Sequence, residues 1–293
     1  MKNCTINSVQ ELIQYTSYIL DPLNSSYRYR GQSNYSWSLQ PSIYRFQNLK
    51  RYQTMFFEEI LLQYKPKFEI PPILNTNFDF EWLMLCQHYE IPTRFLDWTS
   101  DALTSLFFSC YENFNDDGAL FICDMKDYPT IPSINFNPVD IQDLVFLNSS
   151  IFNPRMRAQS GSFMIWGHSP LNPDISKESY DLWEYYKQKI DNKYFIEKLI
   201  IPKEKKIDFL HILDKHYNIN YENLYLNNVT NKIVLNTLTK TKYEVLNTTL
   251  YVTESNKLSS LEKSILKFKL PHLGEDCFAN CSNMRSLKIR FRP

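Results

Sequence analysis

Polar and ionisable residues are threaded through an apolar segment between residues 86 and 109 of this 293-residue chain. Gln87, His88 and Asp97 stand among Leu, Trp and Phe there, and the apolar stretch 102–108 follows directly. Polar groups held against apolar neighbours cost free energy unless they are paired with other groups. Neither a surface loop nor an ordinary core segment has this composition. The segment therefore predicts a functional site whose polar side chains are held by buried apolar residues.

The composition indicates a folded protein without a general affinity for polyanions. Hydrophobic residues make up 43% of the chain and aromatic residues 15%, which excludes a disordered protein. The formal net charge is zero, although acidic residues predominate between residues 79 and 143 and basic residues after residue 236. That basic tail is a candidate contact for nucleic acid or for an acidic partner.

The sequence predicts a cytoplasmic protein that binds neither a membrane nor a metal ion. No stretch approaches the roughly 18 consecutive apolar residues of a membrane span, and the first residues lack the apolar core of a secretory signal. Six cysteines in a chain of this length indicate free thiols. Cys277, Cys281 and His272 lie near one another in sequence, but no fourth ligand has the spacing of a zinc module.

Apolar periodicity predicts a chain in which helices and strands are mixed. Helices are expected at residues 8–20, 50–65, 81–89, 101–110 and 204–215, and strands at 27–31, 119–124, 162–166 and 198–202. Thr99, Ser100 or Asp101 is expected to cap the fourth helix. Pro92 is expected to end the third helix, which places His88 at its C-terminal end. Residues 135–154, rich in Asn and Pro, are interpreted as irregular.

Six short blocks follow one another along the chain. They are Tyr29-Arg30-Gly31-Gln32, Trp37 to Arg45, Gln87 to Thr99, Asp117 to Phe121, Arg157 to Phe163, and Ile200 to Pro202. In this order they resemble the FRG-domain family, with Tyr29 at a position where that family usually has phenylalanine. The resemblance runs from about Tyr27 to Val234. It implies an N-terminal helical layer of residues 1–26, an FRG domain of residues 27–235 and a basic C-terminal extension of residues 236–293.

The order of the blocks is also similar to that of ADP-ribosyltransferases. Those enzymes place an arginine on an early strand, a Ser/Thr motif before an Ala-x-x-Phe helix, and an acid on a later strand. Arg30, Thr99 and Gln159 take these three places here. The similarity implies an α+β fold with a split, mixed β-sheet and flanking helices. Because Gln159 carries no negative charge, Asp97 or Glu90 is expected to supply it.

The resemblance implies NAD as a co-substrate, held by side chains and strand edges. With 5 glycines in the chain, a glycine-rich nucleotide loop is hard to build. The guanidinium fork of Arg30 suits a pyrophosphate or ribose edge, while Tyr29 or Trp98 offers a ring for nicotinamide. The predicted catalytic residues are Arg30, His88, Arg94, Asp97 and Gln159. The predicted NAD-binding residues are Tyr29, Arg30, Gly31, Gln32, Trp98 and Thr99.

These residues also have structural interpretations, which stay open at this point. Arg94 and Asp97 lie three residues apart and are spaced to form an ion pair with each other. Thr99 is a candidate helix cap, Trp98 a candidate core residue, and Gly31 permits either an unusual backbone angle or the close approach of a ligand.

Three functions are compatible with this pattern. The first is an NAD-dependent ADP-ribosyltransferase that modifies RNA, DNA or protein. As the resemblance implies, it would be a toxin or effector of a bacterial anti-phage or toxin–antitoxin system with a neutralising antitoxin. The second is a non-catalytic nucleic-acid or nucleotide-binding module that uses its many aromatic rings. The third is a metal-independent nuclease, with His88 as base and Arg30 and Arg94 on the phosphate.

Overall fold

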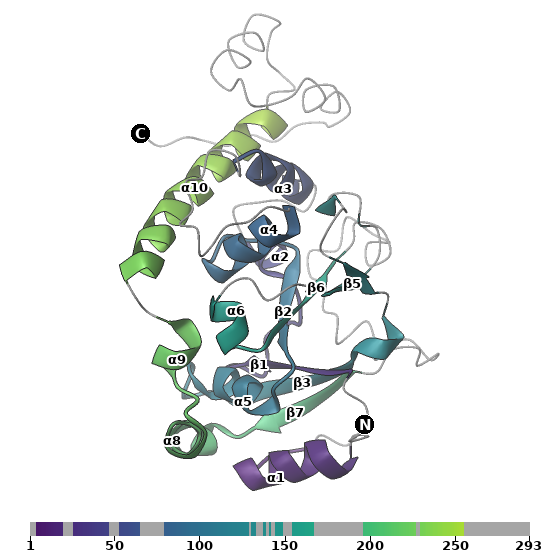
Figure 1. Cartoon of the computed structure of the whole chain (residues 1–293), viewed down its shortest axis with the longest axis vertical. Coiled ribbons are helices and arrows are strands. Elements are labelled where there is room, and N and C mark those ends of the chain that lie inside the picture. Colours follow the sequence, from purple (N-terminus) through teal and green to yellow (C-terminus); the bar gives the residue numbers. More distant parts are fainter. Residues whose placement is uncertain are drawn as a thin grey trace, which may run out of the picture.

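The fold is a mixed β-sheet with helices packed on it (Figure 1). The computed structural model describes residues 4–19, 26–46, 53–64, 79–128, 130–132, 137–138, 141, 144–148, 154–166, 196–226 and 229–254. Within these residues the strands are β1 (Tyr27–Gln32), β2 (Phe95–Thr99), β3 (Gly118–Asp124), β4 (Thr130–Pro132), β5 (Val145–Asn148), β6 (Gly161–Ile165) and β7 (Ile196–Ile201).

The sheet has two parts that meet at one residue pair. Its strand order is β4-β5-β6-β2-β1-β3-β7 among the described residues, and neighbours are antiparallel except for the parallel pair β4 and β5. Strands β1 and β3 pair over six residues, as do β3 and β7, whereas β1 and β2 pair only at Tyr29 and Thr99. The predicted α+β fold with a mixed sheet is therefore confirmed.

Helices cover both parts of the sheet. In the described chain they are α1 (Val9–Gln14, continued by a π-helical turn at Tyr15–Ile19), α2 (Ser42–Arg45), α3 (Gln53–Tyr64), α4 (Asp79–His88), α5 (Ala102–Cys110), α6 (Pro154–Ala158), α8 (Lys206–Tyr217), α9 (Tyr221–Tyr225) and α10 (Val229–Glu254). Helices α1, α5 and α8 pack around β1, β3 and β7, and helices α3, α4 and α10 lie at the other end of the molecule (Figure 1).

The five helices and four strands predicted from periodicity are all present, with ends shifted by a few residues. Asp101 is the residue that caps α5, since its carboxylate accepts hydrogen bonds from the backbone N–H groups of Leu103 and Thr104 at 3.1 and 3.0 Å. Helix α4 ends at His88, as the position of Pro92 predicted. Cys277, Cys281 and His272 lie outside the described residues.

Other elements were not predicted. The irregular assignment of residues 135–154 is wrong at Val145–Asn148, where β5 pairs with β6. Strand β2 was not among the predicted strands. The predicted boundary at residue 236 falls inside α10, which packs on α3 and buries Leu238, Val245 and Leu246 in the same core as α4.

Arg94 enters the core directly before β2 and does not pair with Asp97. Its guanidinium is fully buried and donates from Nε to both carboxylate oxygens of Glu58 on α3, at 3.1 and 3.0 Å. Its Nη1 also donates to the backbone oxygen of Trp166 at 2.8 Å. The predicted Arg94–Asp97 pair is wrong, and Arg94 instead fastens α3 to the segments before β2 and after β6.

Removal of one member of this buried pair should destabilise the fold. Glu58→Gln leaves the Arg94 charge in the core without a counter-ion, and we expect a loss of roughly 3–5 kcal/mol in the free energy of unfolding. Urea denaturation measures it, with Glu59→Gln on the same helix as the matched control. Equal effects of the two substitutions would contradict the role given to the Glu58–Arg94 pair.

Candidate functional site

A cavity of about 310 Å³ opens where β1 and β2 part. Its floor comes from the ends of these strands, and its walls come from the C-terminal ends of α4 and α5 together with α6 and α9. A cavity of this size is at the lower end of the range for small-molecule sites. The lining residues are Tyr29, Arg30, Gly31, Gln32, Ser33, Trp37, Arg45, Gln87, His88, Glu90, Asp97, Trp98, Thr99, Phe108, Tyr111, Glu112, Arg155, Gln159 and Tyr225.

Most of the residues predicted from the sequence meet in this cavity. All but one of them line it, namely Tyr29, Arg30, Gly31, Gln32, His88, Asp97, Trp98, Thr99 and Gln159. The exception is Arg94, which lies in the core with Glu58. The segments that supply these residues lie far apart in sequence, so the fold gathers them at the junction of the two parts of the sheet.

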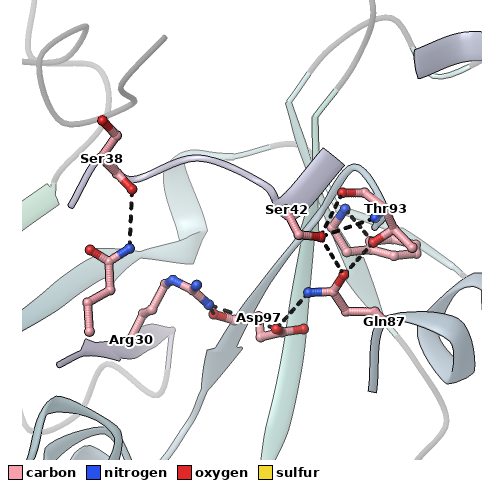
Figure 2. Close-up of polar contacts among 8 residues, drawn as sticks. Arg30, Ser38, Ser42, Gln87, Thr93 and Asp97 are labelled. Atoms are coloured by element: carbon pink, nitrogen blue, oxygen red, sulfur yellow. Dashed lines mark hydrogen bonds and ion pairs between the residues drawn. The ribbon is translucent and has the colours of Figure 1, made fainter. Parts of the chain in front are cut away.

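Arg30 and Asp97 face each other across the gap between β1 and β2. The guanidinium Nη1 of Arg30 donates to the backbone oxygen of Asp97 at 2.6 Å and lies 3.9 Å from its carboxylate Oδ2 (Figure 2). Burial lowers the pKa of Arg30 to about 10, with a further lowering by the charge of Arg45, while Asp97 acts in the opposite direction. Arg30 is therefore still a cation at neutral pH, and it is turned toward a carboxylate.

Gln87 fixes the orientation of the Asp97 carboxylate. Its side-chain Nε2 donates to Asp97 Oδ2 at 2.9 Å, and its Oε1 accepts from the hydroxyls of Thr93 at 2.7 Å and Ser42 at 3.2 Å (Figure 2).

The direction of these bonds follows from the backbone. The Thr93 hydroxyl already accepts from the N–H of Phe95, and the Ser42 hydroxyl accepts from the N–H of Thr93. Each hydroxyl therefore still has its proton to donate, and the Asp97 carboxylate can only accept. Gln87 accordingly turns its Oε1 to the two hydroxyls and its NH₂ group to Asp97.

Five of the buried polar atoms that line the cavity find no hydrogen-bond partner among the described residues. They are Arg30 Nε, Gln32 Oε1, His88 Nε2, Asp97 Oδ1 and Trp98 Nε1. Buried polar atoms are nearly always satisfied in folded proteins, so a cluster without protein partners marks a place for ordered water or a ligand. Two of them are N–H donors and two are acceptor oxygens, which suits a ligand rich in amide and hydroxyl groups better than a simple anion.

His88 is neutral at physiological pH. Burial lowers its pKa from 6.5 to about 4; Arg155 lowers it further and Asp97 raises it. The ring also packs edge-on against Phe163, with centroids 5.7 Å apart. A neutral imidazole can donate or accept at Nε2 according to its tautomer, so His88 adapts to either kind of ligand group.

Thr99, Gln159 and Gly31 also have structural roles. The Thr99 hydroxyl donates to the backbone oxygen of Gln159 at 2.8 Å and accepts from the N–H of Asp101 at 3.0 Å, so Thr99 supports the start of α5 without being its cap. The Gln159 amide donates to the backbone oxygen of Leu224 at 3.1 Å. At Gly31 an added Cβ would lie 2.0 Å from the backbone oxygen of Ser105, so the glycine admits helix α5.

Several residues of the cavity were not predicted as site residues. They are Ser33, Trp37, Arg45, Gln87, Phe108, Tyr111, Glu112, Arg155 and Tyr225, whereas Glu90, which was expected as an alternative carboxylate, also lines the cavity. Trp37 and Arg45 stand in a motif block and Gln87 and Glu90 in the polar segment, so the sequence held a signal for them. No sequence pattern predicted Arg155 or Tyr225 as a site residue. Arg155 donates to the backbone oxygen of His88 at 2.7 Å and lies 4.9 Å from the ring centroid of Tyr225.

The buried ammonium of Lys206 holds two parts of the cavity rim together. It donates to the backbone oxygens of Ser33, Glu112 and Asn113 at 2.6, 3.1 and 2.9 Å. Ser33 follows β1 and Glu112 follows α5, so this contact fixes the spacing between the strand that carries Arg30 and the end of α5.

Comparison with known families matches the first part of this region. Residues 25–118 match the family model of the FRG domain. This part of the chain is therefore similar to an FRG domain. The match includes β1, α4, β2 and α5, and with them Arg30, Gln87, His88 and Asp97. Searches of curated proteins and of solved structures each found no match.

The described residues hold no cluster of three or more His, Cys, Asp or Glu side chains arranged as metal ligands. In the same part of the chain, no helix is both long and apolar enough to cross a membrane.

The lowered pKa of His88 predicts a loss of stability in acid. Between pH 6.5 and 4 the unfolded chain binds a proton at His88 that the folded protein does not, so acidification through this window favours unfolding. We expect the unfolding free energy of the native protein to fall by about 2 kcal/mol more between pH 7 and pH 5 than that of His88→Gln. Urea denaturation at both pH values measures the difference. Exposed His211→Gln serves as the control, and an unchanged pH dependence in His88→Gln would contradict the prediction.

Proposed function

We propose that the FRG-domain cavity binds NAD and that the protein transfers its ADP-ribosyl group to a macromolecule. The observation that carries this proposal is the set of five unpartnered buried polar atoms around the Arg30–Asp97 contact. The proposal includes an ADP-ribosyltransferase-like fold. The narrow junction of β1 and β2 supports it, because it divides the sheet beside the cavity.

The free atoms fit the polar groups of such a co-substrate. Arg30 Nε and Trp98 Nε1 are donors for a carboxamide or phosphate oxygen, while Gln32 Oε1 and Asp97 Oδ1 are acceptors for an amide N–H or a ribose hydroxyl. The cavity is smaller than a complete dinucleotide requires, so we expect it to enclose the reacting part and to leave the remainder on the rim.

NAD would supply a ribosyl carbon whose bond to nicotinamide breaks, and the electron pair of that bond leaves with nicotinamide. An oxygen or nitrogen atom of the target then forms the new bond to this carbon and loses its proton. Asp97 is the carboxylate that we assign to stabilise the positive charge that develops on the ribose. Gln159 is uncharged and its amide is engaged with Leu224, and Glu90 is an exposed residue at the cavity edge. Asp97 is held by Gln87 and faces Arg30, so it is preorganised for this role.

Two observations disfavour the nuclease alternative. Arg94 is buried and paired with Glu58, so it does not reach a phosphate in the cavity. A histidine with a pKa of about 4 is a weak base at neutral pH, which makes His88 poorly suited to activate a nucleophile. The non-catalytic binding module remains the alternative that the experiments below decide.

The similarity to the FRG domain is the basis for the biological role that we propose. We propose a toxin or effector of a bacterial toxin–antitoxin or anti-phage system that acts in the cytoplasm and is neutralised by a partner.

Asp97→Asn should abolish turnover without unfolding the protein. The substitution keeps the size of the side chain and removes the negative charge, so we expect nicotinamide release from NAD to fall by roughly 10²–10³-fold. Chromatography of free nicotinamide measures the rate, and a thermal melt checks the fold. Asp116→Asn, an exposed carboxylate outside the cavity lining, is the control. Normal turnover by the folded Asp97 variant would remove this residue from the chemistry.

Gln87→Glu should shift the pH profile of the same reaction. The substitution places a second carboxylate about 2.9 Å from Asp97 Oδ2, and two carboxylates so close share a proton at low and neutral pH. We expect activity to be lost near pH 7 and to recover as the pH rises, whereas Gln87→Ala should be impaired at every pH. An unshifted profile for Gln87→Glu would show that Gln87 does not act through the charge of Asp97.

A further inference from the structure

Three tyrosines form a compact cluster at the edge of the cavity. Tyr111 follows the last turn of α5, and Tyr221 and Tyr225 lie on the short helix α9. The ring of Tyr221 is nearly parallel to those of Tyr111 and Tyr225, with interplanar angles of 15° and 26° and centroid distances of 5.2 and 4.5 Å. None of the three tyrosines was predicted from the sequence as a site residue.

The distances show which face of Tyr221 is covered. Two rings stacked on opposite faces of a third ring are about 7 Å apart, twice the spacing of about 3.5 Å between carbon atoms in contact. The centroids of Tyr111 and Tyr225 are only 6.2 Å apart. They therefore lie side by side on the same face of Tyr221 and leave its other face uncovered by either ring. An exposed fraction of 37% for Tyr221 agrees with this arrangement.

The cluster is continuous with the candidate active site. Tyr111 and Tyr225 line the cavity, and Tyr221 covers them from outside. The guanidinium of Arg155 lies 4.9 Å from the ring centroid of Tyr225 and also lines the cavity. A planar group on the uncovered face of Tyr221 would thus be separated from the cavity by two ring layers, that of Tyr221 and that of Tyr111 and Tyr225.

From this arrangement we infer that Tyr221 is the stacking site for a nucleobase of a single-stranded nucleic acid. This base neighbours the nucleotide that enters the cavity, so the macromolecular target is single-stranded RNA or DNA. The assignment of that nucleotide as the acceptor rests on the proposed transfer function, but the binding of the strand does not. Flat rings with a free face select planar bases, and a flanking base must be unstacked from its own strand to reach such a ring.

The charges around the cavity make stacking the main source of affinity. Arg45 and Arg155 face the cavity together with Glu90 and Glu112, so the rim is nearly balanced in charge. If the two arginines each neutralise one phosphate, the slope of log Kobs against log salt concentration is about −1.4 for a single strand. We therefore expect weak salt dependence and a clear preference for single strands over duplexes.

Fluorescence anisotropy tests the inference without any turnover, because NAD is left out. The probes are fluorescein-labelled 12-nucleotide single-stranded RNA and DNA of mixed sequence and the corresponding duplexes. The proteins are the native chain, Tyr221→Ala, Tyr221→Phe and, as matched control, Tyr243→Ala, an exposed tyrosine on α10. We expect Tyr221→Ala to weaken single-strand binding by roughly tenfold or more, and Tyr221→Phe and Tyr243→Ala to leave it nearly unchanged.

Three outcomes of this binding experiment would overturn the inference. These outcomes are an absence of single-strand binding to the native protein, equal binding of duplexes, and an affinity that is unchanged in a folded Tyr221→Ala protein. If Tyr221→Ala raises only the KM for NAD, the ring serves the adenine of the co-substrate. If labelled NAD modifies protein while no oligonucleotide binds, the inference fails and the transfer function stands. If oligonucleotides bind through Tyr221 but nicotinamide is never released, the inference stands and the transfer function fails.

Discussion

The contact between Arg30 and Asp97 is the interaction on which the site depends. It bridges β1 and β2 where their backbone pairing has been reduced to Tyr29 and Thr99, so side chains replace the missing ladder of hydrogen bonds. The strands part because their other neighbours hold them, β3 on one side and β6 on the other. The pair places two opposite charges side by side in the lining of the cavity at that junction.

The surroundings of this contact set the orientation of each atom. Gln87 at the end of α4 donates a hydrogen bond to one oxygen of Asp97. The hydroxyls of Thr93 and Ser42 donate to the oxygen of the Gln87 amide and so stabilise this orientation. The other oxygen of Asp97 and the Nε atom of Arg30 have no hydrogen-bond partner among the described residues. Such preorganisation costs stability in the free protein, which is the usual condition of a site that awaits a ligand.

The sequence predicted those parts of the fold and site that depend on local patterns. Polar residues in an apolar segment predicted His88 and Asp97 as site residues, and the apolar period predicted α4 and α5 around them. The destination of Arg94 was not predictable, because its partner Glu58 is 36 residues away on α3 and only the packed fold brings them together. Strand β2 was not predicted because Asp97 interrupts its apolar residues, and β5 was not predicted because its surroundings are rich in Asn and Pro. No local sequence pattern marks Tyr221 and Tyr225 as site residues, because their cluster with Tyr111 forms only when α9 packs beside the end of α5.

The most direct test of the account is incubation of the purified protein with cell lysate and NAD labelled on its adenylate phosphate. The lysate is then separated into protein, RNA and DNA. The proposed transfer chemistry predicts label in a nucleic-acid fraction. It also predicts that the label disappears with Arg30→Ala in a protein that still shows a cooperative thermal melt. No label in any fraction and no release of nicotinamide, from folded protein freed of any inhibitor, would contradict the transfer chemistry and leave a binding module in its place.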